Sequence, residues 1–271
     1  SAAKFPCDSR WRRMLKVRVI PTLLLKDIGL VKGVGFDSWR RVGSAMPAVK
    51  VYNTRDVDEL ILLDISATAE GRGPDIDTIA DLASECFVPL TAGGGVRDVE
   101  TVRRLLRAGA DKVVINTAAY DDTALISEAA LRFGAQCVVA CIDARRSESG
   151  GYECVSRSAT QPTGRRPDEW ARELERRGAG EIMIQSVECD GTLEGYDLEL
   201  TRSISRAVSI PVIASGGAGQ YLHMHDALVK GGASAVAAAA MFHFTEQTPA
   251  GAKAFLADRG IPVRDSAGRG T

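Results

Sequence analysis

Short apolar runs recur along the chain, and most are followed by a segment with the amphipathic spacing of a helix. We expect buried strands at 18–25, 60–64, 113–116, 137–143, 182–186 and 235–239, and two more that end near Thr91 and Ser215. Helices are predicted at 44–52, 98–108, 122–133, 167–177, 197–208 and 249–259. One further helix is expected to begin at Asp75, and another is expected to end at Lys230. Eight strand–helix units joined by short connections predict one α/β domain, a (β/α)8 TIM barrel. A doubly wound open sheet is the alternative.

Two stretches of the chain resemble each other. PLTAGGG occupies 89–95 and PVIASGG occupies 211–217, and Glu59 and Glu181 each stand before the preceding apolar run. The offsets agree, because 211 − 89 and 181 − 59 both equal 122. A shared preference for glycine turns would explain the glycines but not the matching flanks. The pattern therefore predicts an internal two-fold repeat of half-barrels.

Each glycine turn is expected to bind an anion. A turn that leaves backbone N–H groups beside a helix start suits a phosphate. One predicted phosphate site consists of Gly94, Gly95, Asn116 and Thr117; the other consists of Asp190, Gly191, Gly216, Gly217 and Ala239. Two such sites across one mouth predict a substrate phosphorylated at both ends. The alternative is that one site is vestigial.

Charged residues stand at both ends of the predicted strands. Asp143 ends an apolar strand, so we predict a general acid or base; a buried ion-pair partner for a loop arginine is the alternative. Four charged residues stand immediately before strands: Arg18, Glu59, Lys112 and Glu181. They would form a balanced ring at the bottom of the barrel. Such a ring ordinarily serves stability, but it could also gate a small neutral molecule.

Composition narrows the function class. Apolar residues make up 45% of the 271 residues, enough for a large core, and the net charge of −1 argues against nucleic-acid or membrane surfaces. Six cysteines without a CxxC pair favour a reduced, cytoplasmic setting, and the histidine spacing gives no metal site. We expect no metal and no cofactor. We read 1–13 as an extension or tag remnant, 14–264 as the barrel and 265–271 as a flexible tail.

The chain resembles the cyclase subunit of imidazole glycerol phosphate synthase over about 15–264. The matching motifs are LDI at 63–65, TAGGG at 91–95, ADKV at 110–113, INTA at 115–118, AGEI at 179–182, DGT at 190–192, GYD at 195–197, ASGGAG at 214–219 and FHF at 242–244. The resemblance implies a glutaminase partner in a heterodimer, docked at the barrel bottom near Asp111. It implies that ammonia passes the ring of Arg18, Glu59, Lys112 and Glu181. The ammonia then reacts with a bisphosphorylated, nucleotide-like substrate, over which a flexible loop carrying Lys32 could close.

The chain departs from the family pattern at several positions, and these departures leave two functional predictions open. The family has catalytic aspartates at the ends of strands one and five; Asp143 matches the second, but Leu24 stands at the first, and Asp27 belongs to another position. Ala240 and Gln185 replace a usual serine and threonine. This combination resembles a paralogous branch from surface-polysaccharide pathways, in which the barrel passes ammonia to a sugar amidotransferase. The alternative is an active cyclase of histidine biosynthesis.

Overall fold

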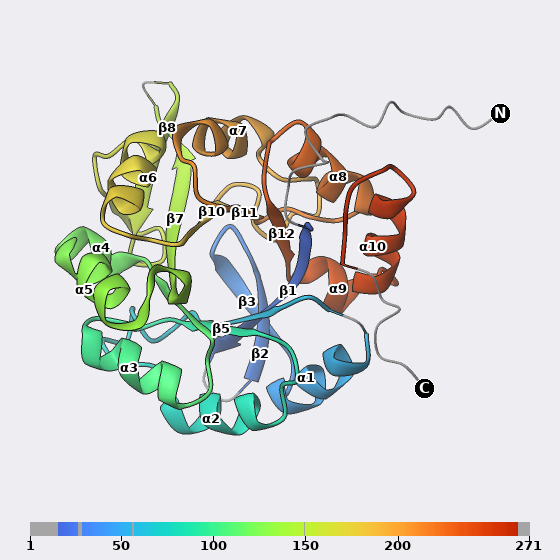
Figure 1. Cartoon of the computed structure of the whole chain (residues 1–271). Coiled ribbons are helices and arrows are strands. Elements are labelled where there is room, and N and C mark those ends of the chain that lie inside the picture. Colours follow the sequence, from blue (N-terminus) through green and yellow to red (C-terminus); the bar gives the residue numbers. More distant parts are fainter. Residues whose placement is uncertain (1–15, 27–28, 56, 149, 265–271) are drawn as a thin grey trace.

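Eight parallel strands close into a barrel, as the computed structural model of residues 16–26, 29–55, 57–148 and 150–264 shows (Figure 1). The strands are β1 (Arg18–Lys26), β4 (Leu60–Asp64), β5 (Leu90–Gly93), β6 (Lys112–Ile115), β7 (Val138–Arg146), β10 (Glu181–Ser186), β11 (Val212–Ser215) and β12 (Ala235–Ala238). Each pairs with the next along the chain, and β12 returns to β1 with Val19 opposite Val236. The predicted barrel is confirmed, and the open sheet is excluded.

Helices surround the barrel, as Figure 1 shows. They are α1 (Ala45–Thr54), α2 (Ile76–Ser84), α3 (Val99–Arg107), α4 (Thr117–Asp121), α5 (Ala124–Phe133), α6 (Pro167–Arg176), α7 (Leu198–Ala207), α8 (Tyr221–Val229), α9 (Ala240–Phe244) and α10 (Pro249–Ala257), with a 3-10 turn η2 (Ala135–Cys137). Asp75, Asp98, Asp197 and Thr248 cap helix starts by accepting from a backbone N–H of the first turn. The segment predicted as one helix at 122–133 is preceded by the separate turn α4, which Asn116 begins.

The two halves of the barrel repeat each other. β5 begins at Leu90 and β11 at Val212, which keeps the offset of 122, and β6 and β12 begin at Lys112 and Ala235, an offset of 123. The backbone contacts repeat as well: the Asp111 N–H donates to Leu90 O, and the Ser234 N–H donates to Val212 O. The half-barrel repeat seen in the sequence is therefore present in three dimensions.

Two hairpins extend from strands of the barrel. β2 (Gly29–Val34) and β3 (Asp37–Gly43) form an antiparallel pair on β1, and in Figure 1 they lie across the middle of the barrel. β8 (Tyr152–Ser156) folds back on β7 at the Gly150–Gly151 turn that the sequence predicted, and β9 (Gln161–Pro162) follows. The segment that we expected to be a flexible loop carrying Lys32 is thus a strand. Its glycines are compatible with extended backbone, and pairing with Leu25 and Lys26 fixes it.

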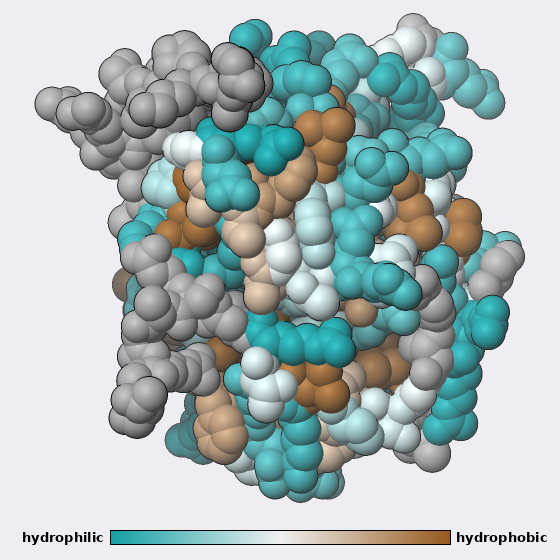
Figure 2. Space-filling view, turned by 90° about the vertical axis from the view of Figure 1, so that its right-hand side faces the viewer, coloured by the Kyte–Doolittle hydropathy of each residue, from teal (hydrophilic) through white to brown (hydrophobic). Residues whose placement is uncertain are grey.

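The core has two parts. One fills the barrel interior with the fully buried side chains of Ile20, Ile61, Val139, Met183 and Ile213, among others. The other lies between the sheet and the helices and includes Trp170, Leu105 and Ile126. The outer face over α8 and α10 is mainly hydrophilic, with hydrophobic residues interspersed (Figure 2). No helix in the described ranges has the length and apolar character needed to cross a membrane.

The first and last parts of the described chain meet at the bottom of the barrel. Val17 forms a bridge with Val263, and its N–H donates to Pro262 O at 2.7 Å. Lys253 of α10 pairs with Asp58 at 3.0 Å, and both side chains are almost fully buried. The predicted extension at 1–13, the tail at 265–271 and Asp27 lie outside the described residues.

Candidate active site

The first pocket opens where β4, β5, β6 and β7 end. Gly94, Gly95, Asn116, Thr117 and Asp143 all line it, so the structure brings these predicted residues together. Gly94 and Gly95 have φ values of 101° and 68°, which favour glycine. A Cβ on Gly94 would lie 2.1 Å from the backbone oxygen of Asp64, so this turn admits no larger residue.

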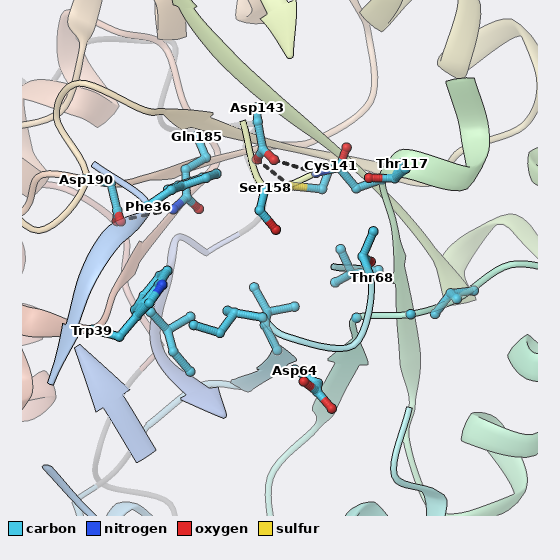
Figure 3. A pocket seen from close by; sticks show the side chains of 18 residues that line it. Phe36, Trp39, Asp64, Thr68, Thr117, Cys141, Asp143, Ser158, Gln185 and Asp190 are labelled. Carbon is cyan, nitrogen blue, oxygen red and sulfur yellow. Dashed lines mark hydrogen bonds between the residues drawn. The ribbon is translucent and has the colours of Figure 1, made fainter. Parts of the chain in front are cut away.

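Asp64 ends β4, but its carboxylate contacts residues of the following loop and not the cavity. Its carboxylate accepts from the Ser66 and Ala67 N–H groups at 3.1 Å and pairs with Arg72 at 2.6 Å. In Figure 3 the Asp64 carboxylate points away from the cavity. We therefore assign Asp64 to holding the loop in place.

The second pocket adjoins the first. Asp190, Gly191, Gly216, Gly217 and Ala239 all line it, as the repeat predicted. Its lining also includes Ala240, Lys32 and His243. Three residues line both pockets and stand between them: Leu24, Gln185 and Asp190. A ligand that reached both glycine turns would pass these three side chains.

Asp143 lies in the first pocket, and the side chains that hydrogen-bond to it are uncharged. Its carboxylate accepts from Asn116 Nδ2 at 2.8 Å and lies 3.7 Å from Cys141 Sγ (Figure 3). Burial raises its pKa to about 6, and the bonds from Asn116 and Cys141 oppose that rise only in part. No arginine or lysine within the described ranges forms an ion pair with Asp143, so the ion-pair alternative is not supported. A pKa near 6 suits proton transfer near neutral pH.

Leu24 occupies the position in the first half that Asp143 occupies in the second. Val19 pairs with Val236 of β12, and Val138 pairs with Val113 of β6. β6 and β12 are repeat equivalents, so Val19 corresponds to Val138. Five residues further along, Leu24 corresponds to Asp143. The mouth therefore has a carboxyl on one side and an aliphatic side chain at the equivalent place on the other.

Asp190 is a second carboxyl in the same mouth, and it is half-buried. It accepts from Gln185 Nε2 at 3.2 Å, and its backbone oxygen accepts from the Gly35 N–H at 3.0 Å. Burial raises its pKa to about 7 and nearby Asp143 adds to the rise; Phe36 N–H, Gln185 and Lys32 oppose it. Both the backbone and the carboxylate of Asp190 thus hold the tip of the β2–β3 hairpin.

Among the residues of the first pocket that sequence reasoning missed are Phe36, Trp39 and Ser158. Phe36 and Trp39 come from the β2–β3 hairpin, neither of whose strands the sequence predicted, and Figure 3 shows them opposite Thr68 and Thr117. Ser158 lies in a run of three left-handed residues, from Arg157 to Ala159, with φ between 51° and 64°. The Arg157 N–H donates to Thr117 Oγ1 at 3.1 Å, which places this run at the first glycine turn.

The four predicted bottom residues form a closed ring. Arg18 contacts Glu59 at 2.7 Å and Glu181 at 3.0 Å, and Lys112 contacts the same two carboxylates at 3.0 and 2.9 Å. Thr91 also donates to Glu59 at 2.6 Å. Burial disfavours the charged form of Glu59, yet Arg18 and Lys112 outweigh it and lower the Glu59 pKa.

A family model described as "Histidine biosynthesis protein" matches residues 18–248, which is most of the chain. The chain belongs to this family. Its members are histidine-pathway isomerases and cyclases built on this barrel. The family resemblance expected from the motifs is thereby confirmed, while the cyclase role and the ammonia transfer stay predictions.

Two residues that we predicted from the family pattern have more specific surroundings than expected. Lys32 is on strand β2 rather than on a flexible loop, and it lines the second pocket. Asp111 is exposed at the strand-start end, but its carboxylate also accepts from the Leu90 N–H at 2.8 Å. Asp111 therefore has a structural role in this family member, whether or not a partner contacts it. Within the described ranges no cluster of His, Cys, Asp and Glu has the arrangement of a metal site.

Proposed function

We propose that this barrel receives ammonia from a glutaminase subunit at its strand-start end and passes it to a separate sugar amidotransferase of surface-polysaccharide synthesis. In this proposal it has weak or no cyclase activity. The observation that carries the proposal is the contrast between its ends: the charged ring is complete, whereas Leu24 stands where a second catalytic carboxyl would be needed.

The ring supports the role of a gate. Each of its two cations contacts both carboxylates, so one cation could swing aside while the other still holds Glu59 and Glu181. Buried ionic groups are weak evidence of stability, because desolvation offsets much of their attraction. A ring of four partly buried charges therefore favours a function in addition to a structural one.

The apolar interior of the barrel supports the passage of neutral ammonia. Above the ring, Ile20, Ile61, Met183 and Ile213 are fully buried, and Thr91 and Ser215 add hydroxyl groups. An ammonium ion would lose its hydration among these side chains, whereas neutral ammonia loses much less. The interior thus suits NH3 rather than NH4+, provided that side-chain motion opens a path.

The mouth supports the absence of cyclisation. Asp143 has the pKa of a useful acid or base, but its repeat equivalent, Leu24, cannot transfer a proton. Loss of a general acid or base typically costs a factor of about 10²–10⁴ in rate. The glycine turns persist, so we expect the mouth to bind a phosphorylated ligand that it turns over poorly.

A cyclisation assay tests the catalytic part of this proposal. With ammonium chloride as the nitrogen source, the unmodified protein should consume little of the bisphosphorylated ribulosyl-aminoimidazole substrate. Leu24→Asp should raise the rate by up to about 10²–10⁴. Leu63→Asp is the matched control. It adds a carboxylate to the same pocket, but at a position whose equivalent in the other half-barrel is not an acidic residue. Turnover by the unmodified protein at an ordinary enzymatic rate would refute the proposal.

An isotope experiment tests the transfer part. With the glutaminase, the amidotransferase and [¹⁵N-amide]glutamine, the aminated sugar should retain ¹⁵N despite excess unlabelled ammonium. Lys112→Met, which opens the ring on one side, should reduce that retention. Equal dilution of the label with and without the barrel would show that ammonia travels through solvent instead.

Active cyclisation is the second candidate, and Asp190 is the observation that favours it. Its carboxyl lines both pockets and has a pKa of about 7, so it could supply the proton that Leu24 cannot. In that case Asp190→Asn would abolish an activity that the unmodified protein already shows, and Leu24→Asp would add little.

A further inference from the structure

We propose that Arg157 is a positioning residue for the first glycine turn, and that its backbone N–H directs the Thr117 hydroxyl toward a bound phosphate. The proposal deepens the proposed function. It rests on the part of that function in which a phosphorylated ligand binds at this turn, and not on ammonia transfer.

Arg157 connects the turn between β8 and β9 to both ends of the short helix α4. Its N–H donates to Oγ1 of Thr117, the first residue of α4, at 3.1 Å. Its Nη2 contacts the carboxylate of Asp121, the last residue of α4, at 3.2 Å. Its Nε donates to Gln161 Oε1 of β9 at 2.9 Å. One residue therefore fixes the turn against the helix whose first side chain lines the pocket.

The same turn has a backbone conformation that residues other than glycine rarely adopt. Arg157, Ser158 and Ala159 have φ values of 51°, 57° and 64°. Strained residues of this kind persist only where their surroundings hold them, and they cluster at ligand sites. The Arg157 carbonyl accepts from Thr160 Oγ1 at 2.7 Å, which helps to close the turn. Figure 3 shows Ser158, the next residue after Arg157, pointing into the cavity.

The bond from Arg157 determines what the Thr117 hydroxyl can do. A hydroxyl has one hydrogen and two lone pairs, so accepting from Arg157 leaves the hydrogen for another acceptor. Because Thr117 is the first residue of α4, no earlier turn of that helix offers it a carbonyl. Within the described ranges the hydroxyl donates to no other group. A phosphate oxygen held beside Gly94 and Gly95 in the same pocket would accept this hydrogen.

The second half-barrel has the same short helix without this hydroxyl. α4 and α9 each have five residues, and their first residues differ by 240 − 117 = 123, which is the offset between β6 and β12. Ala240 therefore stands where the first half has Thr117. The second glycine turn can thus serve as a control within the same molecule.

A purely structural role for Arg157 is the competing explanation. Arg157 and Asp121 are both exposed, and exposed ion pairs contribute little to stability. A structural role predicts that removing the Arg157 side chain affects both glycine turns equally or neither of them. Positioning predicts weaker phosphate binding at the first turn only, and only while Thr117 has its hydroxyl.

Titration with inorganic phosphate, followed by NMR, separates the two glycine turns. The amide resonances of Gly94 and Gly95 report binding at the first turn, where both residues line the pocket. The amide resonances of Gly216 and Gly217 report binding at the second turn in the same sample. The spectrum also shows whether each variant is folded.

Three single variants should weaken phosphate binding at the first turn to different extents. Thr117→Val should weaken it about tenfold, as expected for a lost hydrogen bond to a charged group. Arg157→Ala keeps the N–H but releases the side chain from Asp121, so we expect a loss of about fivefold. Arg157→Lys keeps a cation beside Asp121 and should restore most of that affinity. Arg172→Ala is the matched control and should change neither turn, because Arg172 is similarly exposed (50% against 48%) and pairs with Asp168 within α6.

A double variant tests whether Arg157 acts through Thr117. In the Thr117→Val protein, the further change Arg157→Ala should cost no additional affinity at the first turn, because the hydroxyl is absent. An equal loss with and without the hydroxyl, a loss at both turns, or no loss in Arg157→Ala would overturn the proposal. If Gly94 and Gly95 did not respond to phosphate in the unmodified protein, the proposed phosphate site would fall together with the role of Arg157. The two failures are therefore distinguishable, and neither measurement involves ammonia or turnover.

Discussion

The two ends of the barrel treat buried carboxylates in opposite ways. At the bottom, Glu59 and Glu181 each meet both Arg18 and Lys112, and the pKa of Glu59 falls below its usual value. At the top, Asp143 is buried and Asp190 half-buried beside amides and backbone groups, and their pKa values rise to about 6 and about 7. Charge is balanced at the end that we propose to act as a gate, and left unbalanced at the end where a ligand is expected. The difference separates the proposed gate from the proposed ligand site.

The largest effect should follow from breaking the balance at the bottom. Glu59→Gln leaves Arg18 and Lys112 with one carboxylate between them in a partly buried setting, and we expect a loss of about 3–5 kcal/mol in the free energy of unfolding. Glu85→Gln is the control, because Glu85 pairs with Lys50 on the exposed surface and should cost less than about 1 kcal/mol. Denaturant titration measures both. Equal losses would mean that the ring is energetically no different from a surface pair.

A change of opposite sign is expected at the top. The Asp143 pKa is raised from 3.8 to about 6, so the folded state retains a proton that the unfolded state releases. Stability is therefore lost as pH rises from about 4 to about 6, by up to about 3 kcal/mol, and is constant above that. Asp143→Asn should remove this loss, so the variant should be more stable than the unmodified protein at pH 7 and similar to it near pH 4.

Denaturant midpoints between pH 4 and pH 7 measure this difference. Asp81→Asn, on the exposed face of α2, is the control and should show no such pH-dependent gain. A variant that is less stable than the unmodified protein at pH 7 would show that Asn116 compensates fully for the burial of Asp143.

A smaller effect is expected at Asp111, where two variants should distinguish a contact with the partner from a role in the local structure. Asp111→Lys removes the acceptor of the Leu90 N–H, so we expect a stability loss of about 1 kcal/mol together with weaker glutaminase binding. Asp111→Asn keeps an acceptor oxygen and should weaken binding without that stability loss. Calorimetry with the glutaminase measures the affinity. Unchanged binding by both variants would count against docking at this end.

The smallest effect concerns strain at the top. Ala159 has φ of 64°, a conformation that costs an alanine about 1–2 kcal/mol and that glycine adopts freely. After the extra entropy of glycine in the unfolded chain, Ala159→Gly should gain about 0.5–1 kcal/mol. Ala254→Gly, at an exposed position within α10, should instead lose about 1 kcal/mol. A loss at both positions would indicate that the left-handed turn relaxes in solution.

Two kinds of feature could be predicted from the sequence: those that occur in both half-barrels, and the strands and helices that follow from the spacing of apolar residues. The eight strands, the two glycine turns and the four residues of the ring all follow from apolar runs and from what stands immediately before and after them. A residue at a strand end must lie at the mouth once a barrel is inferred, so the apolar runs alone were enough to place Asp143 and Leu24 there.

Features that depend on contacts between distant segments could not be predicted in this way. The β2–β3 hairpin depends on pairing with β1 and on docking to Asp190, which lies about 150 residues further along the chain. Trp39 therefore carried no signal beyond being an aromatic residue in a polar stretch. The Lys253–Asp58 pair is similar, since nothing in the Ala-rich sequence of α10 indicates that its lysine is buried. Asp64 stands at a strand end like Asp143, but its carboxylate is held by Arg72 and the Ser66 N–H, which the sequence does not reveal.

Val17 contacts Val263, and β1 pairs with β12. The first and last parts of the described chain therefore lie side by side, and the ring of strands has no break although the chain is linear. A short linker across this seam would let the covalent ends be moved elsewhere without reordering any strand. The Gly150–Gly151 turn, exposed at the tip of a hairpin, is a natural place for new ends. Such a permuted chain would begin near β8 and end near β7, so that most of the second half-barrel would precede the first in the gene while both kept their places around the mouth.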